Sequence, residues 1–117
     1  KVGWIKCTDE IERWQKTINK PIIFTEIGYR SCEFAATAPW ENSLNGRVNL
    51  EIQANCYKAA LEVLSGRSWC KGLYWWYWKP SPYAGGSTNR DFTPQNKPAE
   101  TVLTYWYRGI SFAQLDQ

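Results

Sequence analysis

The chain has 117 residues, enough for one ordinary domain, and its 44% hydrophobic and 21% charged residues are typical of a globular protein. The net charge of +3 is too small to indicate nucleic-acid binding, and no apolar run approaches the roughly 18 residues of a membrane span, so we expect neither partner. The sequence has no histidine, which excludes Ser-His triads, Cys-His pairs and His-ligated metals.

Hydrophobic spacing and turn residues predict helices that alternate with strands. In chain order, we expect a helix over residues 8–19, a strand over 22–27, a helix over 50–65, a strand over 73–78 and a helix from Pro98. Strands separated by helices of this length pair in parallel with right-handed crossovers. The sequence therefore predicts an α/β fold in one segment, without a separate second domain.

Capping residues and long loops define the expected boundaries. Thr8 and Asn49 are suitable N-caps for the first two helices, and Pro98 is suitable as the first residue of the third. Two long connections, residues 30–48 and 80–97, each follow a strand. In parallel α/β folds such loops form the site at the carboxyl ends of the strands. We expect the ends of the two strands to lie side by side on one rim.

One acid in the first strand is the leading candidate for chemistry. Glu26 lies among apolar and β-favouring residues, where a charge is costly unless it is paired or has a function. A carboxylate in this position suits the nucleophile of retaining glycoside cleavage, in which a second carboxylate about 5 Å away protonates the leaving oxygen. The alternative is a structural Glu26 paired with Arg30 or another cation.

The chain is rich in aromatic residues, with eight Trp and seven Tyr. Alternation along the second strand places Tyr74, Trp76 and Trp78 on one face. Flat indole rings stack on the C–H faces of sugars, so Trp76 and Trp78 are candidate walls of a sugar subsite, whereas core packing is the alternative. Trp40, in the loop after Glu26, is either a sugar platform or a loop anchor.

The remaining polar candidates leave several readings open. Asp91 and Glu41 are loop acids that either bind a sugar hydroxyl or are simply solvated. The four cysteines have no CxxC spacing, so no zinc or redox motif is indicated, and both two disulfides and four free thiols are compatible with the count. We expect no metal and no cofactor.

Several of these strings together resemble the C-terminal part of glycoside hydrolase family 113. The resemblance runs from about residue 10 to residue 107 and is carried by the following strings: Thr25-Glu26-Ile27-Gly28-Tyr29-Arg30-Ser31, Pro39-Trp40, Gln53-Ala54 with Tyr57, Gly72 through Trp78, and Lys97-Pro98-Ala99-Glu100. Members of that family are (β/α)8-barrel enzymes of a retaining glycosidase clan, known chiefly as β-1,4-mannanases.

The resemblance implies a role for each element of the site. The chain would be the βα7–βα8 portion of a TIM barrel, with residues 22–27 as strand seven and residues 73–78 as strand eight. Glu26 would be the catalytic nucleophile, Trp76 would lie near the sugar that is cleaved, and the substrate-binding set would comprise Tyr29, Trp40, Trp76 and Trp78. The implied substrate is a β-1,4-linked oligo- or polysaccharide, with mannan favoured.

The length of the chain departs from the family pattern. A TIM barrel needs about 250 residues and eight strands, whereas this chain offers two strands. The family's general acid/base is a Glu at the end of strand four, which lies outside this sequence. We therefore expect the rest of the barrel, from upstream sequence or another chain, as a partner, and an isolated chain without hydrolytic activity.

Two other functions remain compatible with the sequence. One is a non-catalytic carbohydrate-binding protein derived from a truncated barrel, and the other is a small α/β interaction domain whose aromatic residues are all in the core. A polysaccharide substrate favours an extracellular location, but the first residues, Lys1-Val2-Gly3-Trp4, do not resemble a signal peptide.

Overall fold

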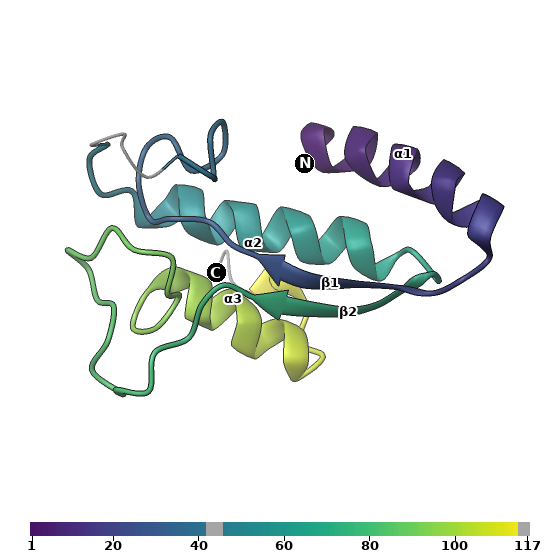
Figure 1. Ribbon diagram of the computed structural model, residues 1–117. Coiled ribbons are helices and arrows are strands. Elements are labelled where there is room, and N and C mark those ends of the chain that lie inside the picture. The colour runs from purple at the N-terminus through teal and green to yellow at the C-terminus, as the bar shows by residue number, and fades with distance from the viewer. Residues whose placement is uncertain (42–45, 115–117) are drawn as a thin grey trace.

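The computed structural model describes residues 1–41 and 46–114, and it contains helices and parallel strands in alternation (Figure 1). The elements are α1 (Val2–Ile18), β1 (Ile22–Ile27), α2 (Leu50–Ser65), β2 (Cys70–Trp75), α3 (Pro98–Tyr107) and a short 3-10 helix, η1 (Phe112–Gln114). Residues 42–45, which belong to the first expected long connection, lie outside the described residues. The predicted α/β class is confirmed by this order.

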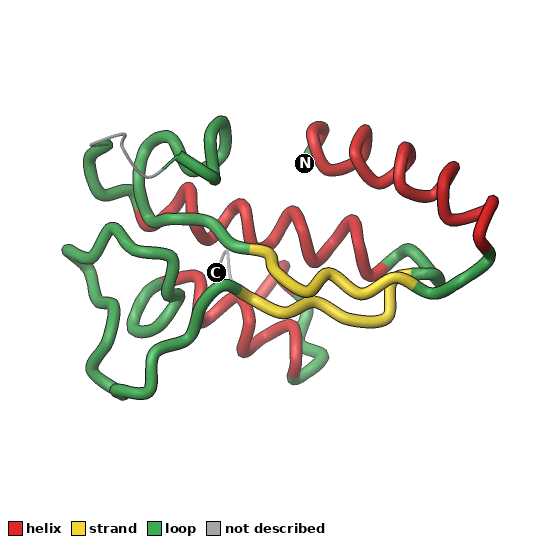
Figure 2. The backbone as a smooth tube through the Cα atoms, viewed as in Figure 1, coloured by secondary structure: helices red, strands yellow, loops and turns green. Residues whose placement is uncertain are grey.

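The two strands pair in parallel, as the sequence predicted (Figure 2). Ile22 lies opposite Cys70, and Ile27 lies opposite Trp75. Beyond the paired residues, both strands lead into the long loops at the same end of the sheet. This parallel arrangement brings the segment after β1 and the segment after β2 together, which is the geometry that a site at the strand ends requires.

The core lies between the sheet and the two helices that cover one of its faces, α2 and α3 (Figure 1). Its fully buried members include Tyr57, Leu61 and Leu64 of α2, which meet Ala99 and Leu103 of α3. Within each helix these buried residues are three or four positions apart, so they form the apolar stripe of an amphipathic helix.

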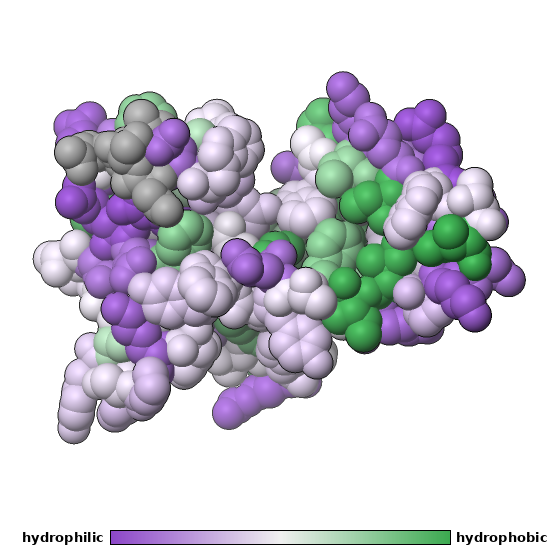
Figure 3. Space-filling view, in the orientation of Figure 1, coloured by the Kyte–Doolittle hydropathy of each residue, from purple (hydrophilic) through white to green (hydrophobic). Residues whose placement is uncertain are grey.

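The opposite face of the sheet carries exposed apolar side chains. Ile23 of β1 is 52% exposed and Tyr74 of β2 is 64% exposed. Figure 3 shows apolar side chains gathered over the two strands on this face. The exposure of large side chains on a parallel sheet is unusual, because parallel sheets are normally covered on both faces.

The first helix begins six residues earlier than the sequence predicted. Thr8, expected as its N-cap, lies inside α1, is fully buried, and donates its hydroxyl hydrogen bond back to the carbonyl oxygens of Trp4 (2.8 Å) and Ile5 (3.0 Å). A mid-helix Thr can satisfy its hydroxyl in this way, so its cap preference does not fix the start of the helix. The helix ends at Ile18, before a left-handed Asn19 (φ 49°).

The second strand is displaced by three residues, to Cys70–Trp75 instead of 73–78. Its ladder with β1 stops at the pair of Ile27 and Trp75, because β1 ends there, so Trp76 and Trp78 lie beyond the paired strand. The predicted alternation nevertheless holds through the displaced end. Tyr74, Trp76 and Trp78 are exposed, and Trp75 is partly buried and stacks on Tyr57 with ring centroids 4.2 Å apart.

Candidate active site

Glu26 lies one residue before the end of β1, with its side chain on the exposed side of the strand. Among the described residues, its carboxylate makes no hydrogen bond or ion pair, and the pairing with Arg30 that the sequence left open does not occur. The guanidinium of Arg30 instead donates to the carbonyl oxygen of Arg90 at 3.2 Å. An uncompensated carboxylate at a strand end is available to an incoming ligand.

A cleft of about 400 Å³ lies beside Glu26. Its walls bring together the ends of β1 and β2 and two loops: Glu26, Ile27, Gly28, Pro39, Trp40, Trp76 and Phe92. Three of the predicted site residues, Glu26, Trp40 and Trp76, therefore share one cleft. Trp40 is 75% exposed and Trp76 is 49% exposed, so both indole rings are open to a ligand.

The floor of the cleft is held by close backbone packing. The amide of Trp76 donates to the carbonyl oxygen of Ile27 at 2.7 Å, which extends the strand pairing by one hydrogen bond. A Cβ atom on Gly28 would lie 2.3 Å from the carbonyl oxygen of Trp76 and 3.3 Å from the ring of Phe92. The Trp76–Tyr77 peptide bond is cis. Only a glycine at position 28 fits between these two backbone segments.

The structure does not bring Tyr29 into this cleft. Tyr29 is 9% exposed, its hydroxyl accepts a hydrogen bond from the indole N–H of Trp4 (2.8 Å), and its ring packs edge-on against Tyr57. Burial, with Cys56 as a further contribution, raises the pKa of Tyr29 above its usual range. Trp78 is 55% exposed but also lies outside the residues that line the cleft.

A second hollow, of about 550 Å³, lies on the other side of Pro39 and Trp40, between α1 and α2. Tyr29 lines this hollow together with Trp4, Cys7 and Cys56. Pro39 and Trp40 thus form a wall shared by both hollows. All four cysteines are free thiols, which answers the question that the sequence left open.

The carboxylate of Asp91, which the sequence left open between a sugar-binding and a solvated acid, has partners within the chain. Its carboxylate accepts hydrogen bonds from the Tyr77 hydroxyl and from the Phe92 amide (3.1 Å), and it forms an ion pair with Lys79 at 3.3 Å. Burial alone would raise the pKa of Asp91, but the hydrogen bonds from Tyr77 and the Phe92 amide, with Lys79, outweigh it and lower the pKa. Asp91 thus braces the loop behind the cleft.

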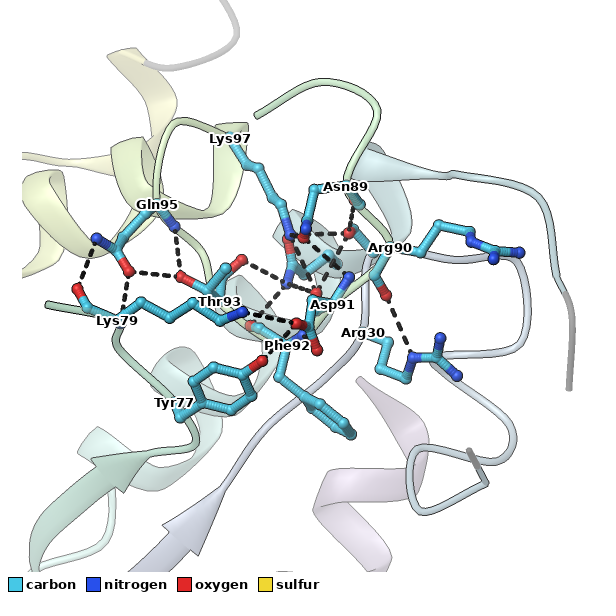
Figure 4. A network of polar contacts seen from close by, with 12 residues as sticks. Arg30, Tyr77, Lys79, Asn89, Arg90, Asp91, Phe92, Thr93, Gln95 and Lys97 are labelled. Atoms are coloured by element: carbon cyan, nitrogen blue, oxygen red, sulfur yellow. Dashed lines mark hydrogen bonds and ion pairs between the residues drawn. The ribbon is translucent and has the colours of Figure 1, made fainter. Parts of the chain in front are cut away.

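Buried polar residues around Asp91 were missed by the sequence reasoning (Figure 4). Gln53, Thr93, Gln95 and Lys97 are all at most 5% exposed. Gln53 and Lys97 connect the two long loops, whereas Thr93 and Gln95 bond to each other within the second loop. The strings Gln53-Ala54 and Lys97-Pro98-Ala99-Glu100, which contribute to the family resemblance, were the signals that pointed to this region. Neither hydrophobic period nor motif spacing indicates a buried amide such as Gln53.

No group of three or more His, Cys, Asp or Glu side chains that could hold a metal ion occurs among residues 1–41 and 46–114. Over the same part of the chain, no helix combines the length and the apolar character that crossing a membrane requires.

Parallel strands, one helical layer and a cleft at the strand ends place the protein among the α/β proteins. The sequence profile of Glycoside Hydrolase Family 113 matches residues 2–97. The chain therefore belongs to glycoside hydrolase family 113. No curated protein matches the chain significantly.

Solved structures of β-mannanases are similar to the chain. Two structures of GH113 β-1,4-mannanase, one of them a complex, match with a TM-score of 0.81, 31% and 32% identity, and 90% coverage of this chain. The GH113 β-mannanase AaManA from Alicyclobacillus acidocaldarius, in complex with ManMIm, matches with a TM-score of 0.81 and 26% identity over 92% of this chain. The chain spans 35% of the length of each of these structures.

Proposed function

We propose that this chain is the βα7–βα8 portion of a TIM-barrel glycoside hydrolase and that Glu26 is the nucleophile of a retaining reaction. The substrate is a β-1,4-linked polysaccharide, with mannan favoured. The observation that carries the proposal is the unpaired Glu26 carboxylate in a cleft whose other walls include the exposed indoles of Trp40 and Trp76. Family membership and the similarity to β-1,4-mannanases support the choice of substrate.

The chemistry follows from the properties of the cleft. In a retaining reaction, a carboxylate attacks the anomeric carbon and forms a covalent glycosyl-enzyme, which water then hydrolyses. Glu26 has no cation that neutralises it among the described residues, so its charge is available for attack. The indole of Trp76 presents a flat apolar face to the sugar ring, and the indole of Trp40 is suited to a neighbouring unit.

The cleft contains half of the catalytic machinery. Among its lining residues Glu26 is the only acid, whereas the reaction needs a second carboxyl group about 5 Å away. The partner of this chain is therefore the rest of the barrel, which supplies the acid/base. The open face and both free edges of the sheet are suited to such a partner, because a barrel leaves no strand edge unpaired.

The decisive experiment measures reducing-sugar release from mannan by the complete barrel that contains this chain. We expect wild-type protein to be active, Glu26→Gln to lose turnover by at least about 10³-fold while retaining oligosaccharide binding, and Glu10→Gln, an exposed change on α1, to have no effect. The isolated 117-residue chain should release no sugar. Loss of binding together with turnover in a folded Glu26→Gln protein would contradict the nucleophile role.

A non-catalytic carbohydrate-binding role is the second candidate, because the exposed indoles of Trp40, Trp76 and Trp78 can stack on sugars and such a role needs no pair of acids. It predicts that oligosaccharides change the tryptophan fluorescence of the 117-residue chain itself and that Glu26→Gln leaves this change intact. The two candidates separate at the complete barrel, where only the first predicts turnover.

A further inference from the structure

The structure contains a buried cation behind the candidate cleft. Lys97, the residue before α3, is 5% exposed, and its Nζ donates three hydrogen bonds: to Ser31 Oγ (2.9 Å), to Asn89 Oδ1 (2.8 Å) and to the carbonyl oxygen of Asp91 (3.0 Å). A lysine ammonium has three donors. All three are used, and each points to a different residue.

This lysine is not held by an ion pair within the described part of the chain. Its three acceptors are neutral, and a buried charge without a partner of opposite sign is costly. Burial accordingly lowers the pKa of Lys97 to about 8. An apolar side chain of similar length would avoid this cost, so the ammonium is not explained by packing alone.

The acceptors belong to two loops that are far apart in the sequence. Ser31 follows β1 and lies five residues after Glu26, whereas Asn89 and Asp91 lie in the loop after β2. Ser31 also joins this second loop directly, because its amide donates to the carbonyl oxygen of Asp91 at 3.3 Å and its hydroxyl donates to that of Asn89 at 2.5 Å. Figure 4 shows Lys97 reaching toward Asn89 and Asp91.

The joined loops carry two walls of the cleft. Phe92 directly follows Asp91 and lines the cleft, and its ring would lie 3.3 Å from a Cβ on Gly28. Gln53 of α2 adds a second brace at the same level, because its Nε2 donates to the carbonyl oxygens of Tyr29 (2.9 Å) and Phe92 (3.0 Å). The path from Lys97 to the cleft therefore consists of one hydrogen bond and one peptide unit.

We propose that Lys97 is a positioning residue, which locks the loop after β1 to the loop after β2 and thereby fixes Phe92 against the segment that bears Glu26. It does not touch the sugar. This link between the two loops, which we call the lock, is a property of the fold. Its effect on turnover rests on the function proposed above. A small misplacement of a reacting group can cost up to about 10²-fold in rate, so loosening the lock should lower kcat.

The test replaces the ammonium by an apolar chain of similar length. Lys97→Met is compared with wild type and with Lys16→Met, a matched change at an exposed position of α1, in the complete barrel protein. Two measurements are made below the unfolding temperature of every variant: amide hydrogen exchange of segments 28–31 and 89–93, and kcat and KM on a soluble mannan.

We expect Lys97→Met to speed exchange in both segments by at least about 10-fold without speeding exchange in α2, and to lower kcat by about 10-fold or more with KM changed less than about threefold. Lys16→Met should match wild type in both readouts. If Lys97→Met does not fold, Asn89→Ala leaves Lys97 in place but removes the acceptor of both its Nζ and the Asp91 amide. This variant should speed exchange in segment 28–31, which the side chain of Asn89 does not bond directly, at smaller amplitude.

The two proposals fail in different ways. Unchanged exchange in both segments overturns the lock, whatever the activity. Faster exchange with unchanged kcat in an active enzyme overturns the positioning role. An inactive wild-type barrel overturns the proposed function, and the exchange measurement still decides whether Lys97 joins the loops. A loss of stability with uniformly faster exchange would assign Lys97 a general structural role instead.

Discussion

Single residues define the candidate cleft more sharply than the elements that carry them. Glu26 and Trp76 approach each other because β1 and β2 end together, and Gly28 permits the backbones to touch there. The distance between the two backbone segments is therefore set by the absence of a side chain at Gly28. The sequence indicated Glu26 and Trp76 as site candidates from their residue types. The close approach at Gly28, however, depends on where the backbone after β1 meets the backbone after β2, and no local pattern encodes this.

Gly28→Ala should destabilise the protein. The added Cβ would lie 2.3 Å from the carbonyl oxygen of Trp76, a backbone atom that cannot rotate away. Strain of this kind typically costs about 1–3 kcal/mol. Urea unfolding of Gly28→Ala and Gly3→Ala gives the comparison, because a Cβ on Gly3 meets nothing within 4 Å and favours helix α1. Equal stability of the two variants would contradict the tight approach.

Lys97 predicts a pH dependence of stability in the alkaline range. Its pKa in the folded protein is about 8, below its ordinary value of 10.5, so between these values the unfolded chain binds more protons than the folded one. Stability from this group therefore rises as pH increases through that window.

Other groups act in the opposite direction over part of the same range. Burial raises the pKa of Cys56 to about 11, which lowers stability as pH rises above about 9. The unfolding free energy of wild type minus that of Lys97→Met isolates the contribution of the lysine. This difference should become more positive between pH 7.5 and about 10. A difference that is flat with pH would show that Lys97 keeps its ordinary pKa.

At the scale of elements, the sequence predicted the order and the type of all five main elements. The strand 22–27 and the helix Leu50–Ser65 agree with the structure residue for residue, because turn residues or caps bound both. The two misplaced boundaries have tertiary causes. Thr8 satisfies its hydroxyl within α1, and the length of β1 determines where β2 stops pairing.

The N-cap of α2 offers a test of element stability. Asn49 has an extended backbone, and its Oδ1 accepts a hydrogen bond from the amide of Ile52 at 3.0 Å, as the sequence predicted. Asn49→Ala should cost about 1 kcal/mol of unfolding free energy. Asn55→Ala, an exposed change in the middle of the same helix, should be neutral or slightly stabilising. A neutral Asn49→Ala in thermal or urea unfolding would show that packing, not capping, sets the start of α2.

At the scale of the whole molecule, the sheet has one covered face and one open face. Helices α2 and α3 bury the first, whereas Ile23 and Tyr74 are exposed on the second. Together with a chain that spans 35% of the length of similar β-mannanases, this asymmetry supports the proposal that the open face belongs to a barrel interior. From the sequence, the mismatch between two strands and the eight of a barrel predicted only that the rest of the barrel is a partner.

A charge on the open face should act in opposite directions in the two contexts. In the isolated chain, Ile23→Lys should reduce self-association, because apolar exposed faces and free strand edges promote it and edge charges oppose it. In the complete barrel, the same lysine would be buried without a partner, so the protein should lose several kcal/mol of stability or fail to fold.

Thr17→Lys, an exposed change on α1, is the matched control and should have little effect in either context. Light scattering of the chain and thermal unfolding of the barrel give the two readouts. An Ile23→Lys barrel as stable as wild type would place Ile23 on an outer surface, and with it the whole open face of β1 and β2. The effect of one side chain in two contexts thus decides whether this face of the sheet lies in the interior of a barrel.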